Sequence, residues 1–596
     1  MSRLSPLRPV IMWAADVTKP SVAPPLRQAT TQSRIQYSGI HTELYRRVEW
    51  KGGRNLQTEE KNAGIRFRMS DQPRPLCLAK VLPTDTLINE IDDLGSIVFL
   101  SGRPKGKWKK VHTGDRIFTE NETDQPFSHP EKTFRKVWTN FGHYVRELGR
   151  LPTATPYLWF ECYRENTSLS DVKRRLEYVA HLPRGGVDVC ASAVTDTHAC
   201  VTQVASVAGV TRELLPHASR RYNLNPTFVR PIRYASKACG IARGNRFVVI
   251  LRSVESVPDM TTLTTHGFLN YFPLSHFGAS GVGWHEIGLL LAQGMYEEVL
   301  RGWLQCEAEA HPLAYTHYLK YLSASPDDAT LEGILLEWSL ALKGWPECSN
   351  LRRALPWIAS KVPPEQVLEK LGVGHMYANA LQGYLWNAAV SRRVHLYGKK
   401  VVVGDIVCVV SDGDGSWLRE HDPTATAEYR KVSTEQEASS FSFADVVIAV
   451  PGRRPAVLDD RSATDSFLAS KGITPERWAR WSHLPMESFY RLVCVKPECL
   501  ETTVVTDPFS HAVLKPDLFL IQERLDPEDA TLLSRLRSPC AVNVTPQYEA
   551  MMKDCVKGPL TVGISCVLPR GCHMSTLLRE VYDVRYKNFH ELLIPN

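Results

Sequence analysis

The sequence predicts an α+β protein in which strands near both ends of the ordered chain enclose a long helical region. Apolar, strand-like runs occupy residues 76–91 and 244–254 and return at residues 560–568. Between residues 284 and 398, apolar residues recur at helical spacing. From Gly404 to Pro451 short strands and turns replace the helices. This change in the predicted secondary structure indicates an inserted α/β module.

Bulk composition narrows the class of protein. The chain has 596 residues, of which 43% are hydrophobic and 23% charged, so it is long enough for two or more folded domains and is not a disordered chain. Its formal net charge of +7 permits a polyanionic partner. The 14 cysteines include no C-x-x-C pair, which indicates free thiols in a reducing compartment. No apolar run is as long as a membrane span, so we expect no membrane insertion.

The N-terminal segment differs from the rest of the chain. Residues 1–42 are rich in Ser, Thr and Pro and contain a single acid, Asp16, against Arg3, Arg8, Lys19, Arg27 and Arg34. This composition is typical of a mitochondrial transit segment, and a disordered basic tail is the alternative. We therefore assign residues 1–75 to a transit segment and basic extension and expect the protein in the mitochondrial matrix.

The ordered elements begin at residue 76. Residues 76–91 alternate like a strand, residues 168–182 show helical spacing and lead into a strand near Val189, and residues 244–254 form another strand. A helix or helical pair follows in "GWHEIGLLLAQGMYEEVLRGWL", from residue 283. Residues 101–110 are predicted to be a basic loop that either is simply solvated or binds RNA through phosphate contacts and base stacking; its side chains are Arg103, Lys105, Lys107, Trp108, Lys109 and Lys110.

One carboxylate, Asp196, stands out in the stretch "AVTDTHACVTQ". A Thr-Asp pair is a common turn former whose Asp caps its own backbone, so a structural role is one interpretation. The flanking apolar runs place Asp196 at a strand end beside the core, where it could instead do chemistry. The other familiar motifs do not fit. "FGASGVG" lacks the spacing of a nucleotide-binding loop, "SDGDGSW" lacks the glutamate at the twelfth position of a calcium loop, and "WHEIG" lacks a second zinc ligand. We therefore predict no metal and no nucleotide or other cofactor, so that an enzyme here must work with a carboxylate.

Several segments, taken in order, resemble the TruD family of pseudouridine synthases. "KVLPTDTLINEI" is similar to its Lys-x-x-Pro-x-Asp segment, and "SAVTDTHACVTQ" to its catalytic aspartate segment, matching at Asp196, Ala199, Thr202 and Gln203. "GNRFVVILR" resembles a Gly-Asn-x-Phe strand, and "GFLNYFPLSHFG" the Gly-Phe-x-Asn-Tyr-Phe segment. "LQGYLWNAAVSRRV" and "LPRGCHMSTLLREV" resemble two later segments of the family.

The resemblance implies a catalytic domain with a mixed β-sheet flanked by helices, interrupted by the TruD-type α/β insertion domain. The catalytic domain would comprise residues 76–266 and 546–596, and the insertion with its long helical region residues 267–545. The resemblance also implies that Asp196 is the catalytic aspartate, that Lys80 holds it ionised, that Phe272 stacks on the target base, and that Asn270 orients the loop or the substrate.

The sequence departs from the family pattern close to these residues. Thr195 stands where the family has Lys, and Ser275 and His276 replace Gln and Arg. These losses should weaken phosphate contacts, which His276 could restore only if it were protonated. Two functions therefore remain. One is a mitochondrial synthase acting on tRNA, rRNA or mRNA; the other is an impaired homologue that binds RNA and assembly-intermediate proteins of the mitochondrial ribosome.

Overall fold

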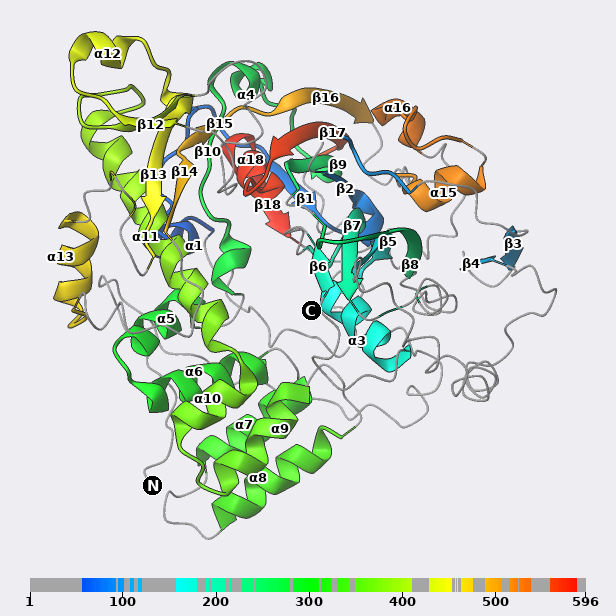
Figure 1. The fold of residues 1–596 in the computed structure, drawn as a ribbon, viewed down its shortest axis with the longest axis vertical. Coiled ribbons are helices and arrows are strands. Elements are labelled where there is room, and N and C mark those ends of the chain that lie inside the picture. Colours follow the sequence, from blue (N-terminus) through cyan, green and yellow to red (C-terminus); the bar gives the residue numbers. More distant parts are fainter. Residues whose placement is uncertain are drawn as a thin grey trace. The chain divides into compact units, whose positions relative to one another are not determined.

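The computed structural model divides into two compact units (Figure 1). The first, here the helical unit, comprises residues 1–69, 269–411 and 427–494; the second, here the sheet unit, comprises residues 70–268, 412–426 and 495–596. The structure describes residues 56–92, 95–100, 108–111, 116–119, 157–179, 189–191, 196–208, 210, 215, 227–239, 242–278, 282–309, 312–323, 330–343, 349–409, 428–452, 456, 458, 462–474, 488–505, 514–523, 525–536 and 558–586.

The sheet unit is built on a mixed sheet with ten strands among the described residues. Its main path runs β16-β17-β9-β2-β7-β5-β8; β1 pairs with β9 and β18, and β6 pairs with β7. The β1–β18 and β2–β7 pairs are parallel and the others antiparallel. The strands are β1 (Leu76–Ala79), β2 (Thr86–Ile91), β5 (Tyr157–Glu165), β6 (Val189–Ala191), β7 (Cys200–Ala208), β8 (Thr227–Ala235), β9 (Gly244–Val254), β16 (Glu498–Val505), β17 (Leu560–Pro569) and β18 (Asp583–Tyr586).

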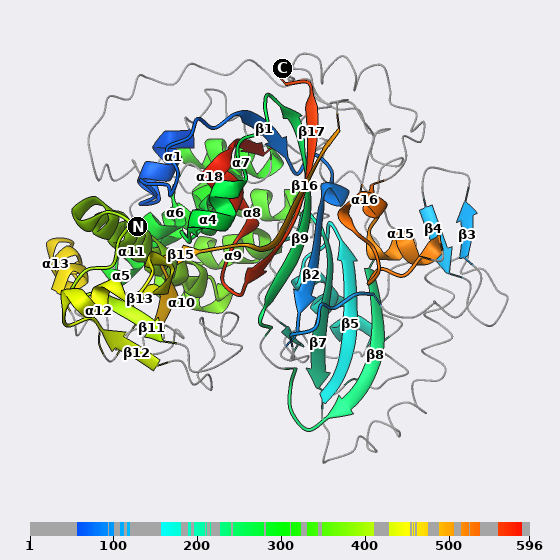
Figure 2. The ribbon, with the colours of Figure 1, turned by 90° about the horizontal axis from the view of Figure 1, so that it is seen from above.

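The pattern of burial explains which strands are central. Every residue of β2 is buried, and β9 is buried from Phe247 onward, because both strands have neighbours on each edge and cover on each face. On one face, α3 (Leu169–Val179) packs its Val172 and Leu176 onto β5 and β7. On the other face, Leu514 and Leu532 pack against β9, where Figure 2 shows α15 (Asp517–Gln522) and α16 (Leu532–Arg535).

Smaller elements complete the sheet unit. A 3₁₀ turn, η2 (Pro83–Asp85), separates β1 from β2, and a two-stranded ribbon is formed by β3 (Trp108–Val111) and β4 (Arg116–Thr119). The remaining helices are α4 (Thr261–His266) and α18 (Met574–Val581). The short pair β10 (Phe268–Leu269) and β15 (Cys494–Val495) contains two of the positions at which the chain passes from one unit to the other.

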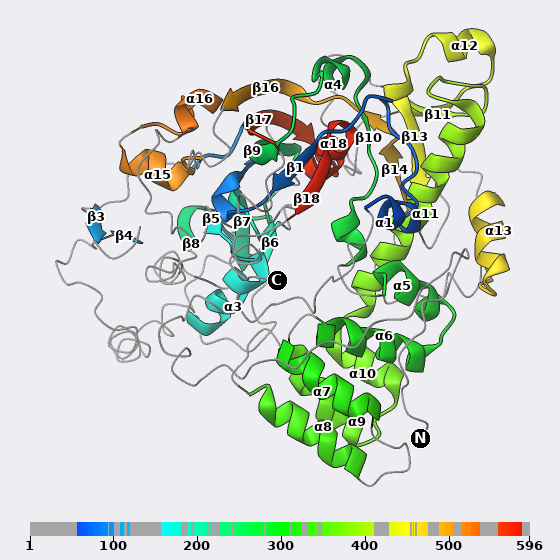
Figure 3. The same ribbon diagram turned by 180° about the vertical axis from the view of Figure 1, so that it is seen from behind.

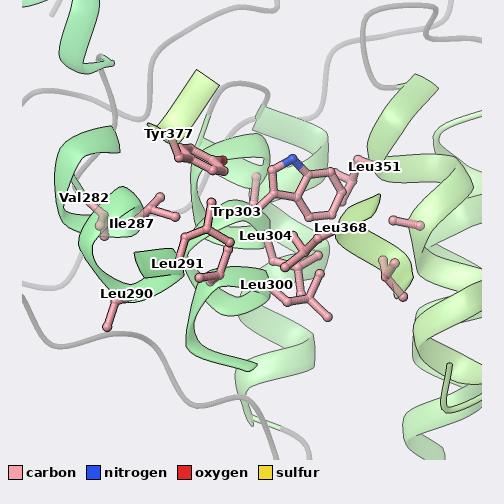
Figure 4. Close-up of a cluster of buried hydrophobic side chains, with 14 of the residues drawn as sticks. Val282, Ile287, Leu290, Leu291, Leu300, Trp303, Leu304, Leu351, Leu368 and Tyr377 are labelled. Carbon is pink, nitrogen blue, oxygen red and sulfur yellow. The ribbon is translucent and has the colours of Figure 1, made fainter. Parts of the chain in front are cut away.

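The helical unit is organised around one long helix, α11 (Gly374–Tyr397), which Figure 3 shows beside the shorter helices. Gly288 allows α5 to approach it closely, because a Cβ there would lie 2.3 Å from the Tyr377 carbonyl oxygen. A large apolar core, including Trp303, Leu304 and Leu351, joins the helices (Figure 4). These helices are α5 (Trp284–Ala292), α6 (Tyr296–Glu309), α7 (Pro312–Ser323), α8 (Thr330–Ala341), α9 (Ser349–Ala359) and α10 (Pro364–Leu371).

A second sheet lies in the same unit. Its described strands run in the order β12-β11-β13-β14, all antiparallel. The strands are β11 (Ile406–Val409), β12 (Glu428–Lys431), β13 (Val446–Val450) and β14 (Phe489–Leu492). The same unit also contains α1 (Leu56–Asn62), η4 (Leu274–Phe277), α12 (Glu435–Ser439), η6 (Phe443–Asp445) and α13 (Ser462–Ser470). The predicted change from helices to short strands after residue 404 is confirmed.

The α+β class with a mixed sheet is confirmed, as are the strand at 244–254 and the helix after residue 168. Three expectations need correction. Residues 76–91 form two strands interrupted at Lys80, not one. Trp108, Lys109 and Lys110 lie in a strand instead of a loop. Folded structure starts before residue 76, because Asn387 and Ser391 of α11 donate hydrogen bonds to the backbone carbonyls at residues 63 and 64.

The division into units also differs from the predicted boundaries. Among the described residues, 495–505, 514–523 and 525–536 group with the sheet unit and not with the insertion, and β16 pairs with β17 of that unit. Residues 1–55, which hold the proposed transit segment, lie outside the described part of the chain. Within the described residues, no helix is both long enough and apolar enough to cross a bilayer.

Candidate active site

Asp196 lies in the turn that leads directly into β7. Its carboxylate forms an ion pair with the Lys80 ammonium through Oδ2, and Oδ1 accepts a hydrogen bond of 3.1 Å from the His198 backbone N–H. The two side chains are 24% and 30% exposed, so the pair is largely shielded from water without being closed off from a ligand. The structure thus brings together the predicted catalytic aspartate and its predicted cation.

This environment keeps the aspartate ionised. Burial acts to raise the pKa of Asp196, but the charge and hydrogen bond of Lys80, together with the His198 backbone N–H, outweigh it and hold the pKa below the usual range of an aspartate. Burial lowers the pKa of His198 below its ordinary value, and the Lys80 charge acts in the same direction. The turn therefore presents a carboxylate that can act as a nucleophile or as a base.

Lys80 has an unusual backbone conformation that the neighbouring chain must impose. It adopts a left-handed conformation, with φ of 57°, between β1 and η2. Such a conformation costs a non-glycine residue on the order of 1 kcal/mol and persists only where the surroundings impose it. Here the chain after Lys80 is anchored by Asp85.

Asp85 and Arg252 form the anchor of this segment. Asp85 has no exposed surface and accepts two hydrogen bonds from Arg252 of β9, at 2.9 and 2.6 Å, as well as one of 2.9 Å from the Leu82 backbone N–H. Arg252 is 1% exposed. The motif pattern had shown Asp85, but not its partner, because the partner is 167 residues away in the sequence.

Phe272 belongs to the helical unit. Its backbone is fixed by the side-chain amide of Asn387, which accepts from the Phe272 N–H at 2.9 Å and donates to the Phe272 carbonyl at 3.1 Å. The ring is half-buried, and its edge-to-face neighbour is Trp386, at 5.7 Å between centroids. A partly open aromatic ring on a fixed backbone is suited to stacking on a planar ligand.

Arg491 organises the same loop from β14. It donates to the carbonyl oxygen of Asn270 at 2.8 Å and to its side-chain oxygen at 3.0 Å, while its guanidinium carbon lies 4.2 Å from the centre of the Phe272 ring. Asn270 is fully buried and its amide donates to the Leu492 carbonyl at 3.2 Å. Of the two roles expected for Asn270, these contacts favour orientation of the loop.

His276 packs against Phe272 as a neutral ring. The ring centroids are 4.8 Å apart, and Nε2 donates to the Asn379 carbonyl at 3.0 Å. Burial lowers the pKa of His276 to about 4, with Arg491 acting in the same direction. The imidazole is therefore uncharged near pH 7, and the protonated form needed for a phosphate contact is disfavoured; stacking is the role that this geometry supports. Gly383 makes room, since a Cβ there would lie 2.7 Å from His276 Cδ2.

The predicted site residues are thus divided between the units. Asp196 and Lys80 belong to the sheet unit, whereas Asn270, Phe272 and His276 belong to the helical unit. Trp108, Lys109 and Lys110 lie on β3, and Arg103, Lys105, Lys107 and Thr195 lie outside the described residues. In the part of the chain that the structure describes, no group of three or more His, Cys, Asp or Glu side chains could hold a metal ion.

Comparison with known proteins gives consistent matches. The family model of tRNA pseudouridine synthase D (TruD) matches residues 132–511. Multisubstrate pseudouridine synthase 7 of Schizosaccharomyces pombe is 23% identical over 425 residues, covering 65% of this chain and 59% of that protein. The pseudouridylate synthase 7 homolog of Homo sapiens is 26% identical over 316 residues, covering 50% of this chain and 42% of that protein. The matches thus span about half the length of these relatives.

A solved structure described as TruD from Methanosarcina mazei is 15% identical in sequence, with a TM-score of 0.46, and covers 88% of this chain and 98% of that one.

Proposed function

Because the chain belongs to the tRNA pseudouridine synthase D (TruD) family, we propose that it isomerises specific uridines in RNA and that Asp196 is its catalytic residue. The observation that carries the proposal is the ion pair of Asp196 with Lys80, which keeps a shielded carboxylate charged in the turn before β7. Phe272, fixed by Asn387 and Arg491, is the proposed stacking partner of the target base.

The proposed reaction is an isomerisation in which the base is detached from the ribose and rejoined through another atom. The bond between N1 of uracil and C1′ of the ribose breaks, the base turns, and C5 bonds to C1′; C5 then loses a proton and N1 gains one. Asp196 either attacks the sugar or removes a proton from it. A uridine within a stem must first leave its stack, and stacking on Phe272 would offset part of that cost.

We place the substrate among tRNA, rRNA and mRNA, and the protein in the mitochondrial matrix. The net charge of +7 favours an RNA partner, and the arginine-rich, acid-poor segment before residue 43 favours import. Matches to both a multisubstrate synthase and a tRNA pseudouridine synthase family leave the choice of RNA open between these classes.

A second candidate is an RNA-binding assembly factor of the mitochondrial ribosome that has little activity. The loss of a cation at position 195 and the neutral state of His276 favour it, since both remove charge that would otherwise hold phosphate.

The experiment that separates the two candidates is pseudouridine mapping on mitochondrial RNA. Cells depleted of the protein are rescued with the native chain, with Asp196→Asn, or with Asp526→Asn, which changes an exposed aspartate of the same unit as a control. We expect a site that returns with the native and control chains but not with Asp196→Asn. If growth and ribosome assembly return equally with all three and no uridine changes, the enzymatic proposal is wrong and the assembly role stands.

A further inference from the structure

The turn that carries Asp196 is held by a second element that the sequence motifs do not include. This element is the C-terminal end of β5, where Arg164 is completely buried and Asn166 follows the last strand residue. β5 pairs with β7 so that Glu165 lies opposite Cys200, which brings this end of β5 beside the turn at residues 196–199.

Arg164 contacts the start of the turn. Its Nη1 donates to the Asp196 backbone carbonyl at 2.7 Å and to the Thr167 carbonyl at 2.6 Å, and Nη2 lies 3.5 Å from the Gln203 side-chain oxygen. One guanidinium therefore links the turn before β7 to the turn after β5. Burial lowers the pKa of Arg164, and the Asp196 charge opposes this effect.

Asn166 contacts the end of the same turn. Its backbone N–H donates to the Ala199 carbonyl at 3.1 Å, and its side-chain oxygen lies 3.1 Å from His198 Nδ1. It has a φ of 43°, in the left-handed region that asparagine tolerates better than most residues. This conformation lies between the end of β5 and the start of α3 at Leu169.

We propose that Arg164 and Asn166 are positioning residues that fix the two ends of the catalytic turn and so aim the Asp196 carboxylate. The inference rests on the proposed function of Asp196. Lys80 acts on the carboxylate itself, through charge, whereas Arg164 acts on the backbone that carries it. A misplacement of about 1 Å in a reacting group can cost about 10²-fold in rate, so a backbone clamp is sufficient to matter.

Loss of the Lys80 charge and loss of the Arg164 backbone contacts should have different effects on the kinetics of the whole chain. Arg164→Lys retains a positive charge but loses the planar guanidinium, whose Nη1 reaches both carbonyls while Nη2 lies beside the Gln203 side chain. We expect it to lower kcat about 10²-fold, to leave the KM for RNA unchanged, and to leave the acid limb of the pH–rate profile in place. Asn166→Gly, which tolerates the positive φ but lacks the amide, should show the same pattern more weakly.

Arg535→Lys is the matched control. Arg535 lies in the same unit, has no exposed surface, donates to two backbone carbonyls, those of Lys515 and Pro527, and also forms an ion pair with Asp517. It does not belong to the catalytic turn. A general cost of replacing a buried arginine would therefore appear in both lysine variants, whereas a loss of kcat specific to Arg164→Lys indicates positioning.

Hydrogen–deuterium exchange tests the clamp without using activity. In Arg164→Lys, peptides covering the turn at residues 196–200 should exchange about tenfold faster, as expected for loss of one charge-assisted hydrogen bond, and in Arg535→Lys they should be unchanged. Normal kcat or unchanged local exchange in Arg164→Lys would overturn the clamp. If the native chain isomerises no RNA while the exchange pattern is as expected, the proposed function fails but the clamp on the turn stands.

Discussion

The buried Asp85–Arg252 pair offers a strict test of how the Lys80 segment is anchored. Arg252→Met removes two of the three hydrogen bonds that Asp85 accepts and leaves only the one from the Leu82 backbone. Both side chains are at most 1% exposed, so water cannot replace the lost partner. Breaking a buried ion pair from one side costs about 3–5 kcal/mol, a large part of the roughly 5–15 kcal/mol that stabilises a domain.

The assay should report on the sheet unit alone, because a chain with two compact units need not unfold in a single step. Native-state hydrogen exchange on peptides from β2 and β9 supplies that local free energy. We expect the opening free energy to fall by about 3–5 kcal/mol in Arg252→Met. Activity should fall as well, because the chain that positions Lys80 loses its anchor.

The double variant Asp85→Asn/Arg252→Met separates charge from packing. Asn has almost the same volume as Asp and carries no charge, so the double variant should be destabilised by less than the sum of the two single changes. A loss below about 1 kcal/mol in Arg252→Met, the value typical of a surface pair, would refute the anchoring argument. Strict additivity in the double variant would do the same.

Two further predictions concern the candidate residues of the sheet unit and of the helical unit, taken separately. Lys80→Met removes the charge that lowers the pKa of Asp196 and leaves burial to raise it, so the acid limb of kcat against pH should move to higher pH; an unmoved limb would contradict the ion-pair argument. In the native chain, the lowered pKa of Asp196 contributes stability that is present above the ordinary pKa of an aspartate and is lost as the pH falls through the folded-state pKa; Lys80→Met should lose this contribution. Arg491→Met removes the hydrogen bonds to the carbonyl and side-chain oxygen of Asn270 and the contact with the Phe272 ring. We therefore expect the KM for RNA, measured by initial rates, to rise about tenfold. A native KM would show that the loop holds Phe272 without Arg491.

The sequence was sufficient for elements with a strong local pattern and for side chains with distinctive chemistry. The strand at 244–254 was predicted with its observed bounds, because it is a long apolar run next to a turn. The apolar runs on either side single out Asp196 as an acid beside the core, whereas its catalytic role is implied by the resemblance to the TruD family. The break at Lys80 was missed, since a left-handed residue inside an alternating pattern leaves no periodic signal.

The supporting residues could not be predicted because their roles arise from distant pairings. Arg252 and Arg491 sit in strands that read simply as buried segments, and nothing local shows which carboxylate or carbonyl each one meets. Asn387 likewise appears as one polar position on a long helix, although it holds both Phe272 and the carbonyl of residue 63. The roles of such residues can be assigned only from the fold, which brings together partners that are more than 100 residues apart in the sequence.

The histidine at position 276, where the family pattern has arginine, changes both the charge and the packing around Phe272. An arginine in place of His276 would bring a second cation toward Arg491, whose charge already disfavours protonation of the imidazole. The neutral ring instead packs on Phe272 and bonds to the Asn379 carbonyl, in space that Gly383 leaves open. The histidine therefore leaves less positive charge beside Phe272 than an arginine would while the aromatic ring stays fixed, so we expect any loss to fall on RNA affinity before it falls on the chemistry of Asp196.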